Sequence, residues 1–393
     1  MNHTFDALVV GAGFAGAVTA RELAERGNLR VLVLERRDHI GGNAYDCLDQ
    51  AGVLIHQYGP HIFHTNNKRV FDYLSRFTQW RDYQHRVIAN IPDGKTGGRM
   101  TYPVPFNLTS LETAFGLEEG RRLGDKLLEA YGPERKVTIL ELRQSADPEI
   151  AALADYVYEH VFVHYTMKQW GQTPEEIDPN TTARVPVFLS RDDRYFQDAY
   201  QGMPLEGYTP LFEKLLDHPG IAVELGTDAL KRLDLSGDRV RVDGEVFEGP
   251  VIYTGQADEL FGFQFGPLPY RTLDFRFETL PRDDFQGYGT VNYTVDEDYT
   301  RITEFKHMTG QVKPGVTTIV KEYSRSYTGA PEETPYYAII NPENNALYAR
   351  YQEAAGRFPN LRLLGRLAEY KYYNMDAIVA RALELSDQLL ETL

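Results

Sequence analysis

A glycine pattern near the N-terminus has the spacing that binds the phosphates of a dinucleotide. Gly11, Gly13 and Gly16 follow an apolar run, open a helical pattern and precede Glu35 at the end of a second apolar run. The first glycine permits a tight turn, the second lets a pyrophosphate approach the backbone, and the third lets helix and strand pack closely. The helix N-terminus adds N–H groups and positive partial charge. The alternative is a glycine-rich turn that binds no ligand.

The residues after this motif indicate which dinucleotide is bound. Glu35 can accept hydrogen bonds from an adenosine ribose and disfavours a 2′-phosphate, although Arg36 and Arg37 beside it leave that possibility open. The glycine pair Gly41 and Gly42 follows, and Asn43 comes next. A glycine pair at this place suits a cofactor whose second half passes close to the backbone. This is similar to the extended FAD signature of flavoproteins. Near the C-terminus, the segment 364–366 is a second place where a strand end meets a glycine.

Two histidines three residues apart, His61 and His64, lie in the segment 58–65. Histidine is a common metal ligand, but no acidic or cysteine ligand stands at a useful spacing, so we expect no metal site. The two histidines are either structural or part of a loop against a cofactor ring, where they would tune the electronics of a flavin.

Aromatic residues, several of them near arginines, are frequent in the segments 165–171, 184–204, 292–301, 336–337 and 366–374. Aromatic rings stack on a nucleotide base, and a guanidinium group binds phosphate through two hydrogen bonds, so this mixture favours an anionic nucleotide ligand. The alternative is a tyrosine-rich helix packing face with its arginines in surface ion pairs.

The elements that must position these residues alternate between strand and helix. A strand over 5–10, a helix over 15–26 and a strand over 28–35 form the start of a parallel sheet. Helical periodicity then dominates residues 107–180, and residues 270–325 alternate apolar and polar side chains as in an antiparallel sheet with one wet face. The predicted remaining elements are a loop over 184–210, a helix over 210–216, strands within 221–256, a strand at 361–365 and a helix over 375–390.

These elements predict an α/β protein in which a Rossmann-like FAD-binding domain carries an inserted helical domain and an antiparallel β-sheet domain. The expected domains are FAD-binding, 1–90 with 211–260 and 350–393; helical with a mobile substrate loop, 107–200; and antiparallel sheet, 91–106 with 261–349.

Composition excludes several classes of protein. The 41 basic and 57 acidic residues give a formal net charge of −16, which makes the chain a poor binder of nucleic acid. Cys47 is the sole cysteine, so the chain has no internal disulfide and no cysteine-based metal cluster. No apolar run reaches the length of a membrane span, and no basic leader precedes the first strand. We therefore expect a soluble, cytoplasmic protein without a membrane partner.

Ordered blocks along the chain carry a resemblance to a known family. GAGFAG, IGGN, YGPHIFHT, YTMKQWG, ARVPV, DDRYFQDAYQGMPLEGYT, YTRITEFKH and GRLAEYKYYNMD together resemble the bacterial UDP-galactopyranose mutases. The resemblance runs over nearly the whole chain, and its middle blocks are very specific. It implies an isomerase that interconverts UDP-galactopyranose and UDP-galactofuranose without net redox change but with reduced FAD, whose N5 is the nucleophile toward the anomeric carbon. It also implies UDP as a ligand and a homodimer or higher homo-oligomer.

The resemblance assigns roles to residues of this chain block by block. Arg184 and Arg301 would hold the diphosphate of the leaving UDP, and His64 lies beside the flavin ring. The residues expected to bind the sugar nucleotide are Tyr165, Thr166, Trp170, Arg184, Tyr195, Asn292, Arg301, Tyr337 and Tyr372. The residues expected to bind FAD are Gly11, Gly13, Phe14, Ala15, Gly16, Glu35, Arg36, Gly42, Asn43, His61, Ile62, Gly365, Arg366, Asn374 and Met375.

Two departures from the family pattern and two rival functions stay open. Asn374 stands where many relatives carry aspartate, which puts an acid–base role there in doubt, and the polar stretch 90–103 is longer than expected. The rivals are an FAD-dependent oxidoreductase of the amine-oxidase-like class and a nucleotide-binding protein without catalytic activity. The physiological reductant, the range of sugar nucleotides and the oligomer geometry do not follow from the sequence.

Overall fold

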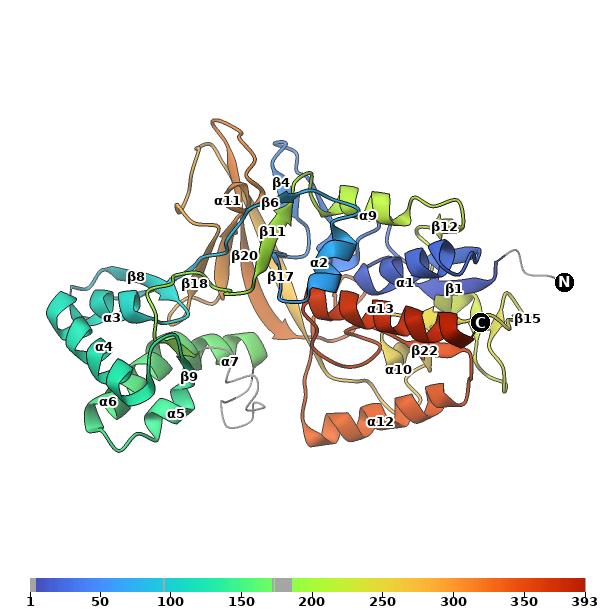
Figure 1. Ribbon diagram of the computed structural model, residues 1–393. Helices are drawn as coiled ribbons and strands as arrows, with labels where there is room; N and C mark the ends of the chain where they lie inside the picture. Colours follow the sequence, from blue (N-terminus) through green and yellow to red (C-terminus); the bar gives the residue numbers. More distant parts are fainter. Residues whose placement is uncertain (1–4, 95, 172, 174–185, 393) are drawn as a thin grey trace.

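A parallel sheet of five strands lies at one end of the molecule in the computed structural model, which describes residues 5–94, 96–171, 173 and 186–392 (Figure 1). The strand order is β12-β2-β1-β16-β22, and neighbouring strands all run in parallel. These strands are β1 (Ala7–Val10), β2 (Val31–Leu34), β12 (Ile221–Glu224), β16 (Val251–Tyr253) and β22 (Leu361–Leu363). The sheet thus combines segments from the first, middle and last parts of the chain.

Both faces of this sheet are covered, which is why its strands are apolar throughout. Ala7 and Val9 point into a core formed with four helices, whereas Leu8 and Leu32 point into a second core on the opposite face. The helices of the first core are α1 (Phe14–Glu25), α2 (Lys68–Leu74), α9 (Tyr208–Leu216) and α13 (Met375–Thr392). The second core includes side chains from α10 (Ala257–Leu260) and α12 (Pro342–Gly356) and from the small sheet β13 (Leu233–Asp234), β14 (Arg241–Val242) and β15 (Glu245–Val246).

A seven-stranded sheet stands beside the parallel one and extends toward the helical part (Figure 1). Its order is β21-β17-β20-β19-β18-β7-β8, and every neighbouring pair is antiparallel except β7 with β18. The strands are β7 (Val87–Pro92), β8 (Arg99–Val104), β17 (Tyr270–Leu280), β18 (Thr290–Tyr293), β19 (Arg301–Glu304), β20 (Thr317–Ser326) and β21 (Tyr337–Ala338). The polar stretch 90–103 therefore forms the hairpin that joins β7 and β8 at one edge of the sheet.

The helical part begins and ends at residues that the sequence marks clearly. The side chain of Asn107 caps the first helix by accepting from the backbone N–H of Ser110, and Asp147, followed by a proline, caps another. The elements are α3 (Leu108–Phe115), α4 (Leu117–Tyr131), α5 (Ile139–Arg143), α6 (Pro148–Val157), a π-helical turn (Tyr158–Val163) and α7 (His164–Trp170). The π-helical turn lies between α6 and α7, and it shifts the register of α7.

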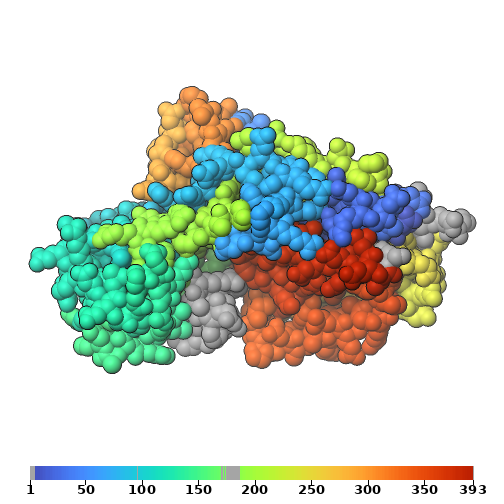
Figure 2. Space-filling view, in the orientation of Figure 1, coloured from blue at the N-terminus to red at the C-terminus, as the bar shows by residue number. Residues whose placement is uncertain are grey.

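The segment 186–204 joins the helical part to the rest of the molecule. Figure 2 shows residues of the light-green segment running from the helical lobe to the blue surface near α2. That segment contains β10 (Val187–Phe188), which pairs with β9 (Lys136–Val137), and β11 (Tyr200–Pro204), which pairs with β5 (Phe63–Thr65) and β6 (Trp80–Arg81). The segment predicted as a loop over 184–210 therefore contains these two short strands, which the sequence did not reveal because their partners lie far away in sequence.

The predicted architecture, a Rossmann-like domain with an inserted helical part and an antiparallel sheet, is confirmed. The proposed domain limits at 90 and 350 fall inside β7 and α12, and the limit at 200 falls at the first residue of β11. Among the described residues, no helix combines the length and the apolar character needed to cross a bilayer.

Candidate functional site

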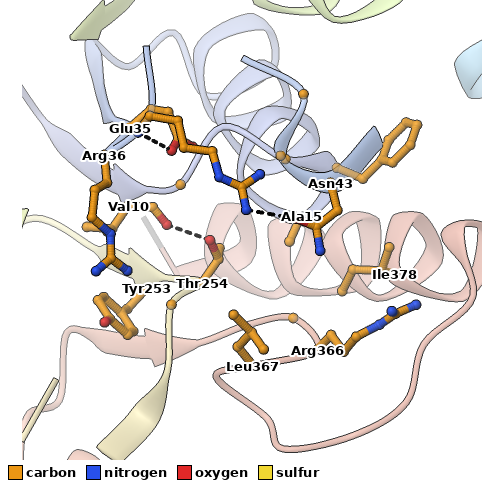
Figure 3. A pocket seen from close by; sticks show the side chains of 18 of the residues that line it. Val10, Ala15, Glu35, Arg36, Asn43, Tyr253, Thr254, Arg366, Leu367 and Ile378 are labelled. Atoms are coloured by element: carbon orange, nitrogen blue, oxygen red, sulfur yellow. Dashed lines mark hydrogen bonds between the residues drawn. The ribbon is translucent and has the colours of Figure 1, made fainter. Parts of the chain in front are cut away.

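A cavity lies along the carboxyl ends of β1, β2 and β16, where an open α/β sheet binds its ligand (Figure 3). Its lining joins the turn before α1, the end of β2, the segment 41–44 and the start of α13. The predicted cofactor residues in the lining are Gly11, Gly13, Phe14, Ala15, Glu35, Arg36, Gly42, Asn43, His61, Gly365, Arg366 and Met375. Ile62 packs in the first core, Asn374 is exposed, and neither they nor Gly16 reach the lining.

The glycines make room for backbone and ligand in different ways. A Cβ on Gly16 would lie 1.9 Å from the carbonyl oxygen of Gly11, so Gly16 permits close packing of helix on strand. A Cβ on Gly13 would meet nothing closer than the Cα of Gly42 at 3.6 Å, so the space beside Gly13 is open to a ligand. Gly13 is also the N-cap of α1 and offers no side-chain acceptor to the first-turn N–H groups, which therefore suit a phosphate.

The two arginines after Glu35 have different partners. Arg36 forms an ion pair with Glu259 at 2.8 Å and is more than half exposed. The Arg37 guanidinium packs on the Tyr58 ring at 4.1 Å and donates to Oδ1 of Asn43 at 2.9 Å, while its buried Nη1 has no hydrogen-bond partner. A buried unpaired donor of an arginine that lines the cavity fits an anionic cofactor. The sequence prediction named Arg36 as a cofactor residue and left out Arg37.

Further lining residues come from segments that carry no motif. They follow β16, precede the small sheet, or lie in the loops near β21 and α13: Thr227, Asp228, Ala229, Leu230, Tyr253, Thr254, Pro335, Tyr373 and Ile378. Their proximity to the glycine turn depends on the order of strands in the sheet, which no local pattern in the sequence encodes.

The histidine segment places His61 at the cavity and His64 elsewhere. Nδ1 of His61 lies 2.9 Å from the carbonyl oxygen of Gly59, and its backbone N–H donates to Nδ1 of buried His56 at 3.0 Å. His64 instead pairs through Nδ1 with Asp198 at 2.6 Å. The two predicted histidines therefore do not converge. Among the described residues, the one group of three side chains close enough to share a metal is Asp284, Glu304 and His307, a set that excludes both.

Three histidines, the buried His56 and His85 and the half-buried His61, are held neutral at ordinary pH. Burial lowers the pKa of His56 to about 4, and burial, with smaller effects of nearby positive groups, lowers the pKa of His61 and of His85 to about 3. His56 also accepts a backbone hydrogen bond at Nδ1, which requires that nitrogen to be unprotonated. Because the native state holds these rings neutral, it is more stable at neutral pH than at acidic pH.

We expect the free energy of unfolding to fall as the pH drops below about 6.5. The unfolded chain then protonates these rings at their usual pKa of 6.5, whereas the native state does not until pH 4 to 3. Each ring removes up to roughly 1.4 kcal/mol per pH unit in that window. Urea unfolding between pH 7.5 and 5.0 measures the slope, and His56→Gln, which keeps an acceptor, should reduce it by one ring's share. An unchanged slope in that variant would contradict the assignment.

A second site surrounds Arg301 on β19. Nε of Arg301 lies 3.2 Å from Oε2 of its cross-strand neighbour Glu322 without the alignment of a hydrogen bond, and Oε1 of Glu322 has no hydrogen-bond partner. Glu322 is 2 % exposed and Arg301 23 %. Burial raises the pKa of Glu322 and Arg301 opposes the rise, whereas Glu322 and nearby tyrosines outweigh burial and raise the pKa of Arg301. The Nε–H of Arg301 is thus a donor without a hydrogen-bond partner, and a guanidinium with an unused donor is suited to an added anion.

Three of the predicted substrate residues lie around this guanidinium. Tyr165, Tyr195 and Tyr337 all interact electrostatically with Arg301. Burial raises the pKa of Tyr165, and Arg301 partly offsets this. Burial also raises the pKa of Tyr337, so both phenols stay protonated at ordinary pH and can donate hydrogen bonds to a phosphate. The Tyr195 ring stands edge-on to His85 at 5.7 Å.

Arg366 links the Arg301 site to the cavity. It lines the cavity, and its guanidinium also lies over the Tyr372 ring at 4.8 Å and the Tyr337 ring at 5.7 Å. These two tyrosines stack with their centroids 6.0 Å apart. The structure thus brings the predicted cofactor and substrate residues into adjoining sites, and the alternative of a mere packing face with surface ion pairs does not describe Arg301.

Four predicted substrate residues remain, and the structure describes three of them. Asn292 is the cross-strand neighbour of Arg301, and its buried Oδ1 has no hydrogen-bond partner. Thr166 is buried on α7, and Trp170 is the last residue of that helix. Arg184 lies outside the described residues.

His64 stands at the edge of this site and has an acidic partner that the sequence did not reveal. Besides the 2.6 Å contact to Asp198, its ring stacks on Phe196 at 3.5 Å, and Phe196 stacks in turn on His85. Asn66 donates to the other oxygen of Asp198 at 2.5 Å. The pairing of β5 with β11 brings these distant segments together.

Comparison with known proteins agrees with this geometry. The family model described as UDP-galactopyranose mutase matches residues 160–372, and an NAD(P)-binding Rossmann-like model matches residues 9–77. A UDP-galactopyranose mutase of Mycoplasma pneumoniae is 35% identical over 99% of this chain and 97% of its own length. A dTDP-fucopyranose mutase of Escherichia coli is 36% identical over 96% of both chains. The crystal structure of a reduced UDP-galactopyranose mutase superposes with a TM-score of 0.72 at 16% identity, covering 100% of this chain and 95% of that one.

Proposed function

The chain belongs to the UDP-galactopyranose mutase family, and on that premise we propose that it interconverts UDP-galactopyranose and UDP-galactofuranose at the Arg301 site, using reduced FAD. The enzyme is an isomerase. The observation that carries the proposal is the contact of Arg366 with both sites, since it places an anion-binding guanidinium cluster next to a dinucleotide cavity.

FAD is the cofactor that the cavity fits. Gly13 and the N-terminus of α1 would face its pyrophosphate, Glu35 and Arg37 its adenosine side, and His61 with Arg366 the end nearest Arg301. When bound and reduced, the flavin supplies N5 as the nucleophile toward the anomeric carbon of the sugar. The neutral state of His61 keeps an additional positive charge away from that end of the cavity.

Arg301 would bind the diphosphate and stabilise its charge while the bond to the anomeric carbon breaks. A guanidinium offers two parallel donors to a phosphate, and the low exposure of this site strengthens the interaction. Glu322 contacts the guanidinium at Nε, which lies 3.2 Å from Oε2. Arg184 would be the second arginine on the same diphosphate, and together they would retain UDP until it reattaches.

The tyrosines and His64 would complete the substrate site. Tyr165, Tyr195 and Tyr337 can donate phenolic hydrogen bonds to phosphate oxygens, and the amide of Asn292 can bond a phosphate or sugar oxygen. Asp198 orients His64 through Nδ1, which leaves Nε2 to exchange a proton with a sugar hydroxyl during ring opening and closure.

An anaerobic assay with and without dithionite tests the function. We expect conversion of UDP-galactofuranose in the reduced enzyme, little in the oxidised one, and a change of the flavin spectrum on adding UDP. Oxidation of an amine, with no response to millimolar UDP, would support the amine-oxidase-like alternative instead. A parallel assay with dTDP-fucopyranose identifies the preferred nucleotide, because a relative that acts on it is equally similar. Homo-oligomer formation and a cytoplasmic location stay predictions.

A further inference from the structure

Lys168 on α7 binds the backbone of a distant connection. Its Nζ donates to the carbonyl oxygens of Tyr293 at 2.7 Å and Glu297 at 2.8 Å, and lies 3.4 Å from that of Tyr299. These carbonyls belong to the end of β18 and to the connection 294–300 that leads into β19. Within the described part of the chain, Lys168 has no carboxylate at ion-pair distance. The ammonium group therefore holds three backbone carbonyls of β18 and this connection close to one another.

The acidic side chains of the connection are bound from its other side. Arg99, in the β7–β8 hairpin, lies 3.0 Å from Asp296 and 2.9 Å from Glu297 and packs over the Tyr293 ring. Burial lowers the pKa of Lys168, while the same acidic residues oppose that shift. The connection is thus held by its carbonyls to α7 and by its carboxylates to the hairpin, which gives the long hairpin a structural role.

Two further contacts fix α7 against the seven-stranded sheet. Oγ1 of Thr294 donates to the carbonyl oxygen of His160 in the π-helical turn at 2.5 Å. Buried Arg271 on β17 donates to the carbonyl oxygens of Lys168 and Gln169 in the last turn of the helix, both at 3.2 Å. The contact of Lys168 with Tyr293 reaches the last residue of β18, the strand that carries Asn292.

Lys168 stands one turn after Tyr165, so the two side chains leave α7 on the same face. Tyr165 interacts with Arg301, and Asn292 and Arg301 are cross-strand neighbours on the two strands that the connection joins. We propose that Lys168 is a positioning residue of the sugar-nucleotide site, which sets the separation between Tyr165 on α7 and Arg301 on β19. This inference rests on the proposed function, because the proposed function identifies a UDP-sugar as the ligand of this site.

The test compares Lys168→Met with a matched variant elsewhere. Lys306 on α11 (Phe305–Thr309) also binds two carbonyls, those of Lys313 and Val316, both at 2.7 Å, but outside the Arg301 site. We expect Lys168→Met to weaken UDP binding by about tenfold or more and to raise KM more than it lowers kcat, with flavin content unchanged. Lys306→Met should lose comparable thermal stability and keep wild-type UDP affinity.

Several results would overturn the inference. One is wild-type UDP affinity in folded Lys168→Met, and another is equal weakening in both methionine variants. If Lys168→Met does not fold, Lys168→Arg decides: a planar guanidinium cannot reach the same carbonyls equally, so weaker UDP binding supports the role and unchanged binding excludes it. A wild-type enzyme that binds no UDP would instead refute the proposed function itself.

Discussion

Arg301→Ala is expected to lower turnover by about a hundredfold or more while FAD stays bound. Loss of one donor to developing charge in a site shielded from water costs roughly 3 kcal/mol of transition-state stabilisation. Arg301 interacts electrostatically with the half-buried Tyr165, Tyr195 and Tyr337, and it is not among the residues that line the cavity at the glycine turn. Steady-state kinetics of the reduced enzyme, with flavin content measured by absorbance, gives both quantities.

The single substitution also leaves a buried carboxylate without its partner. Removing one member of a buried ion pair costs about 3–5 kcal/mol of stability, because Glu322 is 2 % exposed and would keep its charge or take up a proton. A loss of turnover could therefore reflect partial unfolding. The double variant Arg301→Met with Glu322→Gln separates the two effects, since it removes the unpaired charge and should regain most of the stability but none of the turnover.

Arg276 on β17 provides the control in the same sheet. Its side chain is exposed and packs over the Tyr323 ring at 4.0 Å, outside the group of tyrosines around Arg301. Arg276→Ala should keep near-wild-type turnover. If the stable double variant also turned over normally, Arg301 would have no part in catalysis and the assignment of the diphosphate site would be wrong.

Gly13→Ala and Gly16→Ala are expected to weaken cofactor binding for different reasons. At Gly13 the added methyl meets nothing closer than 3.6 Å, and the backbone is extended with φ −80°, so the apoprotein should fold normally. The methyl would occupy space where a pyrophosphate approaches the backbone, so FAD affinity should fall by tenfold or more, on the order of 1.4 kcal/mol at least. At Gly16 the methyl would collide with the carbonyl of Gly11 at 1.9 Å, so the fold itself is strained.

Thermal unfolding of the apoproteins and titration with FAD distinguish the two variants. Gly16→Ala should lower stability by roughly 3 kcal/mol, as overpacking against backbone does, whereas Gly13→Ala should leave it unchanged. Gly94→Ala, where nothing lies within 4 Å of the added carbon, is the neutral control for both measurements. Wild-type FAD affinity in Gly13→Ala would mean that the pyrophosphate does not approach the α1 turn.

The arrangement of the two sites also accounts for binding of an anion by an acidic protein. The chain carries a net charge of −16, yet Arg301, Arg366 and Arg37 meet at or near the adjoining sites. Charges farther than about 8 Å are largely screened at physiological salt, so the local guanidinium groups decide the potential in a buried site. Net charge therefore does not predict the charge of a small ligand that binds in a closed site.

The sequence by itself determined the features that are local along the chain. The glycine spacing from Gly11 to Gly16 and Glu35 after the second strand each depend on neighbouring residues. Their backbone conformations and hydrogen bonds span a few positions, so periodicity and residue type are sufficient to identify them. The family blocks likewise gave the tyrosines and Arg301.

Only the tertiary structure decided which residues support the site. Glu322 faces Arg301 through strand register, Asp198 reaches His64 through the pairing of β5 with β11, and Lys168 binds backbone carbonyls more than a hundred residues away. Every residue has a backbone carbonyl, so residue types do not reveal which carbonyls Lys168 binds. Strand register is set by hydrophobic burial over whole strands. For this reason the cofactor turn could be identified from the chain alone, whereas the contacts that hold the substrate residues in place required the fold.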